Sequence, residues 1–128
     1  MPSDAVRPVL IVEDDPQIRD VLEELLRIEG FASRSAADGR EAIEMVKTGI
    51  RPAVILLDGM MPGMSGPQFL EARELDPGLF GIPVYLVSAS GEMEDLAGGH
   101  RVNGFLRKPF DPDRLFAIVR RHAGKPPA

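Results

Sequence analysis

Three unbroken runs of apolar residues constrain the fold of this chain more than any other feature: Val9–Val12, Val54–Leu57 and Val84–Val87. Each run has the length of a short strand and is bounded by turn-forming residues. Continuous apolar runs, unlike alternating ones, are typical of strands that are covered on both faces of a parallel sheet. A weaker run at Phe31–Ser35 and a short one at Gly104–Arg107 predict two further strands.

Helical patterns separate these runs. After the first strand, Ile18, Val21, Leu22 and Leu25 recur at helical spacing, and Gly30 is placed to end that helix. A second helix is expected around Ala42, Ile43 and Val46, starting at Asp38 or Gly39 and ending at Gly49. A third is expected around Phe69, Leu70 and Ala72, capped by Ser65 and stopped by Asp76-Pro77-Gly78. A weak fourth covers Glu92–Ala97, and the last follows Asp111-Pro112 and contains Leu115, Ile118 and Val119. This alternation predicts a single (βα)5 α/β domain, a doubly wound five-stranded parallel sheet with helices on both faces.

The length and composition of the chain predict how many domains it has, where it is located and which partners it lacks. The 128 residues suffice for one domain, with expected limits at 1–7 for an N-terminal extension, 8–123 for the folded domain and 124–128 for a flexible tail. The chain has no cysteine, no apolar run of membrane-spanning length and no signal-peptide pattern, so a cytoplasmic location without membrane attachment is expected. Its net charge of −5 argues against direct nucleic-acid binding.

Carboxylates follow two of the predicted strands directly. Asp58 comes after Val54–Leu57, and Glu13 and Asp14 come after Val9–Val12. A carboxylate at the end of a buried strand is costly unless its charge is needed there. If the two strands are parallel neighbours, these carboxylates meet at one edge of the sheet, where their mutual repulsion favours a bound cation such as Mg²⁺.

A hydroxyl and an ammonium follow the last two strands. Ser88 comes after Val84–Val87, and Lys108 comes after Gly104–Arg107. Taken alone, Ser88 is a loop hydroxyl and Lys108 a solvated cation, just as an acidic residue before Pro16 is a helix cap. Together with the carboxylates, they describe a site for phosphoryl transfer. Asp58 would act as nucleophile, Mg²⁺ would neutralise the transferring group, and Ser88 and Lys108 would bind its remaining oxygens.

Five segments in order carry a more specific signal: LIVEDDP (10–16), ADGREAIEMV (37–46), VILLDGMMPGMSG (54–66), LVSAS (86–90) and FLRKPF (105–110). With them the chain resembles the receiver domains of response regulators in bacterial two-component signalling, in particular the single-domain, chemotaxis-regulator-like ones. The resemblance covers essentially the whole chain. It implies a flavodoxin-like sheet with strand order 2-1-3-4-5 and a receiver domain at 8–123.

The resemblance also implies what each residue does. Asp58 would accept a phosphoryl group from the phosphohistidine of a sensor histidine kinase or a phosphotransfer protein. For the metal, the resemblance implies Asp14 as a direct magnesium ligand, Glu13 as a partner of the ion through metal-bound water, and Met60 as a ligand through its backbone carbonyl. Lys108 would bind a phosphate oxygen, and its bond to Pro109 is often cis in the family. Ser88 would be the switch hydroxyl, and Phe105 the aromatic switch residue. For Phe105, a plain core aromatic is a competing interpretation.

Two departures from the family pattern lead to further expectations. In the 91–104 segment, glycines surround a weak helix, and each glycine in a helix costs roughly 1 kcal/mol relative to alanine. This segment is therefore expected to be mobile or partly unwound. In the family it belongs to the usual output surface, which contacts partner proteins. Met60, two residues after Asp58, cannot orient an attacking water, and Ser90 lies two residues after Ser88. A long-lived phosphoryl group is therefore expected.

Other classes of function fit less well. A magnesium-dependent phosphatase with an aspartyl nucleophile typically needs a second acid where this chain has Met60, and a cap domain. A flavodoxin-like nucleotide binder needs a Gly-rich loop where this chain has Glu13-Asp14-Asp15. A receiver-like module used only for protein binding would not need the acidic set. A signalling switch, not an enzyme, is expected; its downstream target is left open, and a homodimer is an option.

Overall fold

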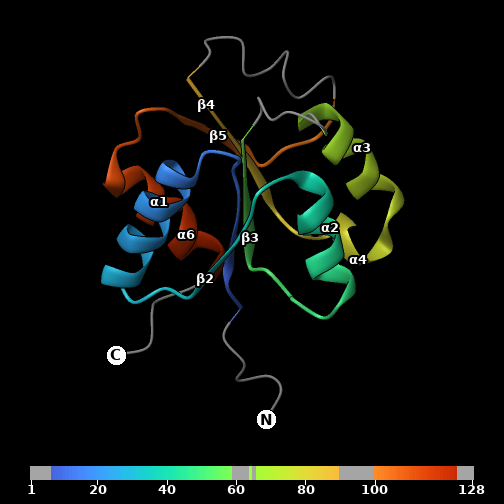
Figure 1. Ribbon diagram of the computed structural model, residues 1–128, viewed down its shortest axis with the longest axis horizontal. Helices are drawn as coiled ribbons and strands as arrows, with labels where there is room; N and C mark the ends of the chain where they lie inside the picture. Colours follow the sequence, from blue (N-terminus) through green and yellow to red (C-terminus); the bar gives the residue numbers. More distant parts are fainter. Residues whose placement is uncertain (1–6, 59–63, 65, 90–99, 124–128) are drawn as a thin grey trace.

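The computed structural model describes residues 7–58, 64, 66–89 and 100–123. Its centre is a five-stranded, all-parallel sheet with the order β2-β1-β3-β4-β5 (Figure 1). The strands are β1 (Val9–Val12), β2 (Ser33–Ala36), β3 (Val54–Asp58), β4 (Val84–Ser88) and β5 (Gly104–Arg107). The predicted doubly wound α/β fold and its strand order are therefore confirmed.

Helices cover both faces of the sheet. They are α1 (Pro16–Ile28), α2 (Gly39–Lys47), α3 (Gly66–Leu75), the short α4 (Pro77–Phe80) and α6 (Pro112–Ala123). Figure 1 shows α1 and α6 on one side of the strands, and α2, α3 and α4 on the other. Alternate residues of each buried strand feed two separate apolar cores: Leu10 packs with the α2–α4 side, and Ile11 with the α1–α6 side. Covering both faces explains why the central strands are apolar throughout.

Side-chain caps start the helices where the sequence suggests. Asp15 Oδ1 accepts a hydrogen bond from the Gln17 amide at the start of α1, and Asp38 Oδ1 accepts one from the Glu41 amide at the start of α2. Each bond satisfies a backbone donor that the first helical turn leaves without a partner. Gly30, at φ +89°, follows α1 in the left-handed region that glycine tolerates best.

Some details differ from the sequence-based expectations. Strand β2 begins at Ser33, because the Phe31 amide still donates to the Leu26 carbonyl at the end of α1 while its ring fills the α1–α6 core. The inward face of α1 is also shifted: Leu22 and Leu26 are buried, whereas Val21 is 54% exposed.

The turn after α3 forms α4, a short helix that the sequence did not predict. Its first turn is capped by Asp76, whose Oδ1 accepts from the Gly78 amide. The expected cap at Ser65 and the weak helix at Glu92–Ala97 lie outside the described residues. In the described part of the chain, no helix has the length and apolar character needed to cross a membrane.

The register of the strands positions the polar residues. Val12 of β1 pairs with Leu57 of β3, and Asp58 pairs with Val87 of β4. Ser88 in turn pairs with Arg107 of β5. The carboxyl ends of β1, β3, β4 and β5 therefore stop at one level of the sheet.

Candidate functional site

Three carboxylates meet at this edge of the sheet. Glu13, Asp14 and Asp58 each offer an oxygen, and these atoms all lie within 4.8 Å of one another. Glu13 and Asp58 are only 2% and 5% exposed, whereas Asp14 is open to solvent. Hard carboxylate oxygens with one open side fit a small divalent cation such as Mg²⁺, which keeps several waters when it binds protein. The residues present therefore fit the metal that the sequence predicts.

Lys108 brings a cation to the same cluster. Its Nζ donates a hydrogen bond of 2.8 Å to Glu13 Oε1 and lies 3.8 Å from Asp58 Oδ2. The Lys108–Pro109 peptide bond is cis. The main-chain amide of Lys108 donates to the Ser88 carbonyl at 2.9 Å, which ties the end of β5 to the end of β4. One ammonium thus faces two buried carboxylates, which leaves the cluster with a net negative charge.

The burial of Glu13 has a chemical consequence. Burial, followed by its hydrogen bond with Asp58, raises the pKa of Glu13 from 4.5 to about 7, although the neighbouring Lys108 acts in the opposite direction. Glu13 Oε2 also accepts a 3.3 Å hydrogen bond from the Asp15 amide. A carboxyl that holds a proton near neutral pH indicates that the cluster carries more negative charge than the protein compensates.

The other predicted site residues lie around this cluster. Ser88 is the last residue of β4 and is 2% exposed. Phe105, on β5, is half-buried and packs against the core on the α2–α4 side. Met60 and Ser90 fall outside the described residues, as does most of the 91–104 segment. The described structure thus brings Glu13, Asp14, Asp58 and Lys108 together, and Ser88 joins them through the Lys108 backbone.

Arg19 is a residue near the site that sequence reasoning missed. Its Nη1 donates to two main-chain carbonyls of the acidic loop (residues 13–15), that of Glu13 at 2.8 Å and that of Asp14 at 3.2 Å. An arginine in the first turn of an amphipathic helix is ordinarily a solvated charge. Only its position, one helical turn after the Asp15 cap, could have suggested that it folds back over the loop.

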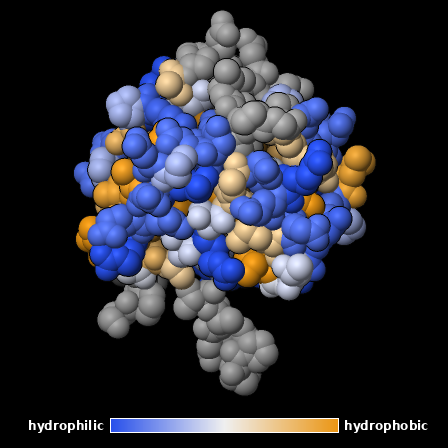
Figure 2. All heavy atoms as spheres, in the orientation of Figure 1, coloured by the Kyte–Doolittle hydropathy of each residue, from blue (hydrophilic) through white to orange (hydrophobic). Residues whose placement is uncertain are grey.

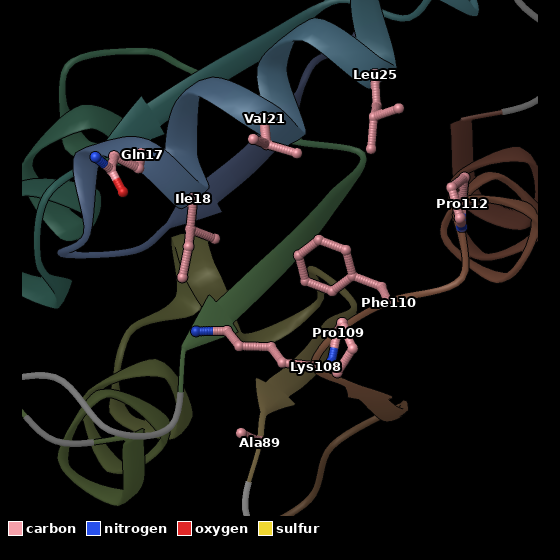
Figure 3. Close-up of a pocket in the computed structure, with 9 residues that line it drawn as sticks. All are labelled: Gln17, Ile18, Val21, Leu25, Ala89, Lys108, Pro109, Phe110 and Pro112. Carbon is pink, nitrogen blue, oxygen red and sulfur yellow. The ribbon is translucent and has the colours of Figure 1, made fainter.

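An apolar groove of about 630 Å³ adjoins the site. Figure 3 shows Ile18, Val21 and Leu25 pointing from α1 toward Phe110, with the Lys108 side chain at one end of the groove. Gln17, Ala89, Pro109 and Pro112 complete its lining. The groove and the acidic cluster thus have Lys108 in common.

Further exposed apolar side chains lie on both flanks of the molecule. Val21 and Ile28 are exposed on α1, and Leu75 and Phe80 are exposed at the ends of α3 and α4. Figure 2 shows a mainly hydrophilic face with apolar atoms toward its two lateral edges. The α1 flank is the one beside the acidic cluster.

Comparisons with known proteins agree with this geometry. The family model of the response regulator receiver domain matches residues 9–120. The DNA-binding response regulator MtrA of Mycolicibacterium smegmatis is 34% identical over 114 residues, covering 88% of this chain and 48% of MtrA. Protein Rrf1 of Nitratidesulfovibrio vulgaris is 36% identical over 113 residues, covering 88% of this chain and 80% of Rrf1. The chain therefore spans about half the length of MtrA.

Solved structures show the same fold. The Vibrio cholerae chemotaxis protein CheY4 superposes with a TM-score of 0.81 at 31% identity, over 92% of this chain and 99% of CheY4. The receiver domain of the sensor histidine kinase PA1611 of Pseudomonas aeruginosa, solved with a magnesium ion coordinated in its active-site cleft, gives 0.83 at 27% identity, over 94% and 100% of the two chains. Receiver domains generally act as regulatory switches. This chain belongs to the response regulator receiver domain family of two-component signalling proteins.

Proposed function

We propose that this domain accepts a phosphoryl group on Asp58, with Mg²⁺ bound by the acidic cluster, and thereby switches its contacts with other proteins. The observation that carries the proposal is the convergence of Glu13, Asp14 and Asp58 within 4.8 Å, with Lys108 beside them. The metal fits the donor set, because buried like charges with one open side favour a hard divalent cation. Asp14 would be a direct ligand, Glu13 a partner through metal-bound water, and Met60 a ligand through its carbonyl.

The chemistry needs few groups. A carboxylate oxygen of Asp58 attacks the phosphorus of a phosphohistidine, the new O–P bond forms as the P–N bond breaks, and the imidazole leaves with the electron pair. Bound Mg²⁺ would supply positive charge to the oxygens of the transferring group. Lys108 lies 3.8 Å from Asp58 Oδ2, close enough to bind a phosphoryl oxygen there. Ser88, at the end of the next strand, would bind another.

The downstream effect would pass through the same residues. Ser88, drawn toward the phosphoryl group, would act as switch hydroxyl, and Phe105 on the neighbouring strand β5 would move with it. In this role the domain is a switch and not an enzyme with its own turnover. It would work in the cytoplasm through protein contacts of residues 8–123, with no direct contact to nucleic acid or membrane and with homodimerisation as an option.

The phosphodonor would be a sensor histidine kinase or a phosphotransfer protein. The groove beside the site supports this part of the proposal, because Val21 is exposed on its wall while Lys108 belongs to both groove and site. An apolar side chain seated in the groove would hold a donor histidine next to Asp58. Docking in the groove would orient the phosphohistidine toward Asp58 before the transfer step, which lowers the entropic cost of the reaction.

The decisive experiment is an adduct assay. The protein is incubated with Mg²⁺ and either a small phosphodonor or beryllofluoride, and the adduct is measured by mass spectrometry or by ¹⁹F NMR. Wild-type protein should form a magnesium-dependent adduct, and Asp58→Ala should form none. An adduct of equal yield in Asp58→Ala, or none in the wild type, would overturn the proposal.

A further inference from the structure

We infer that Arg19 is a positioning residue for the metal site: its guanidinium holds the backbone of Glu13 and Asp14 so that both carboxylates face the cation. The inference rests on the proposed function, because it concerns the same site. It adds a residue that supplies no ligand and makes no contact with the reacting atoms.

The geometry is that of a clasp between α1 and the acidic loop. The Arg19 amide donates to the Asp15 carbonyl at 3.0 Å as part of the first turn of α1. Its side chain then reaches back, and a single nitrogen, Nη1, donates to the carbonyls of Glu13 and Asp14. On the other side of the loop, the Glu13 amide donates to the Ala36 carbonyl at 3.1 Å. Glu13 is thereby held at both its amide and its carbonyl.

These bonds bear directly on the ligands. The direction of a carbonyl fixes the plane of its peptide, and two successive planes set the direction in which the intervening side chain leaves the chain. Repulsion between the carboxylates of Glu13, Asp14 and Asp58 acts to open the loop when no cation is bound. Hydrogen bonds from a charged guanidinium are stronger than those from neutral donors, so they oppose that opening.

Two effects of Arg19 on metal affinity have opposite signs, which makes the inference testable. As a nearby positive charge, the guanidinium repels a divalent cation, so its removal would tighten binding. As a clasp, it orders the ligands before the cation arrives, so its removal would weaken binding. Outer-shell groups that orient metal ligands typically contribute 10- to 100-fold in affinity, which exceeds the effect of one screened charge near solvent.

The test is Mg²⁺ titration by calorimetry of the wild type, Arg19→Met, Arg19→Lys and the control Arg27→Met. Arg27 lies on the same helix, but its guanidinium pairs with the exposed Glu24 side chain. We expect Arg19→Met to bind Mg²⁺ roughly tenfold more weakly, Arg19→Lys to recover part of the loss, and Arg27→Met to match the wild type. Amide shifts of Asp14 and Asp15 in metal-free ¹⁵N spectra should move in Arg19→Met and not in Arg27→Met.

The outcomes separate this inference from the proposed function. Equal or tighter Mg²⁺ binding by Arg19→Met, beside a wild type that binds, overturns the positioning role and leaves the proposed function standing. Failure of the wild type itself to bind Mg²⁺ overturns both. If Arg19→Met does not fold, as judged by circular dichroism, Arg19→Lys decides, and wild-type affinity in that variant overturns the inference.

Discussion

The Nζ atom of Lys108 donates a 2.8 Å hydrogen bond to Oε1 of Glu13, across 95 residues of sequence. Both side chains are largely buried, with 18% and 3% of their surfaces exposed. In the metal-free protein, the cation that would bind the phosphoryl group is therefore held by a carboxylate of the metal site. If Mg²⁺ binds as proposed, with Glu13 reached through metal-bound water, the ion would compete with Lys108 for the Glu13 carboxylate, and Lys108 would be released toward Asp58.

Removing Lys108 should destabilise the metal-free protein. We expect Lys108→Met to lower the free energy of unfolding by up to about 3 kcal/mol near pH 8, because the buried Glu13 then either stays charged without its partner or must bind a proton. The loss should be smaller near pH 5, where Glu13 carries a proton. Urea unfolding followed by circular dichroism measures both values. In a Glu13→Gln background the same substitution should cost much less, and an equal cost there would show that the pair is not the cause.

The raised pKa of Glu13 predicts a pH dependence of stability. Because this pKa is about 7 in the folded protein against 4.5 for an ordinary glutamate, the folded state binds the proton more tightly. The resulting stabilisation is complete below about pH 4.5 and is lost as the pH rises through about 7. Between about pH 5 and about pH 8, the metal-free wild type should lose on the order of 2 kcal/mol relative to Glu13→Gln. Parallel stability curves for the two proteins would contradict the assignment.

Much of this domain could be predicted from its sequence. The apolar runs of β1, β3 and β4 were plain in the sequence, because these central strands are covered on both faces. The edge strands β2 and β5 are only partly buried and left weaker signals, and the resemblance supplied the order of the strands. The acidic cluster was predictable because Glu13 and Asp58 follow buried strands directly, and burial of a carboxylate there costs free energy unless its charge is used.

Other features depend on tertiary contacts that no local pattern records. Val21 fits the helical stripe of α1 but borders an open groove, and Phe31 reads as strand but lies in the core beside α1. Arg19 looks like a surface charge, and its role depends on where the preceding loop folds. The pairing of Lys108 with Glu13, in addition to its proximity to Asp58, depends on distances of a few ångströms that spacing in sequence does not determine.

A charge in the groove should separate the two routes of phosphorylation. Val21→Asp places a carboxylate on an exposed site of the groove wall, so we expect little change in stability. Phosphoryl transfer from a partner kinase should slow by about tenfold or more, because the docked apolar side chain would meet a charge. Phosphorylation by a small phosphodonor should be unchanged.

The matched control for the groove is Ile28→Asp. Ile28 lies on the same helix and is 65% exposed, but it is not part of the groove lining. Kinase transfer to this variant should equal that of the wild type. Equal slowing in both variants would assign the effect to charge on α1 in general and not to docking in the groove.

Close contact between β4 and β5 predicts a strict need for glycine at position 104. A Cβ atom at Gly104 would lie 2.8 Å from Cε2 of Tyr85, whose ring is buried and whose hydroxyl is 2.8 Å from His122 Nε2. Gly104→Ala should therefore cost about 1–3 kcal/mol of unfolding free energy, as overpacking in a core does. Gly81→Ala, where a Cβ meets no atom within 4 Å, should stay within about 0.5 kcal/mol of the wild type in the same measurement.

The identity of residue 60 should control the lifetime of the phosphoryl group. An apolar Met60 cannot orient water for attack on the phosphorus, whereas an amide at this position could. We expect Met60→Asn to shorten the half-life of the Asp58 phosphoryl group, measured as loss of the adduct over time after the phosphodonor is removed. An unchanged half-life would show that other groups limit hydrolysis.

The hydrogen bond from the Lys108 amide to the Ser88 carbonyl has a thermodynamic consequence for recognition. It joins the two residues proposed to bind the phosphoryl group to each other at the end of β5, which is an edge strand of the sheet. A partner that binds this edge and prefers one spacing of the two side chains also changes the free energy of phosphorylation. Since such coupling is reciprocal, the partner alters the stability of the phosphorylated state by the same factor by which phosphorylation alters the affinity of the partner.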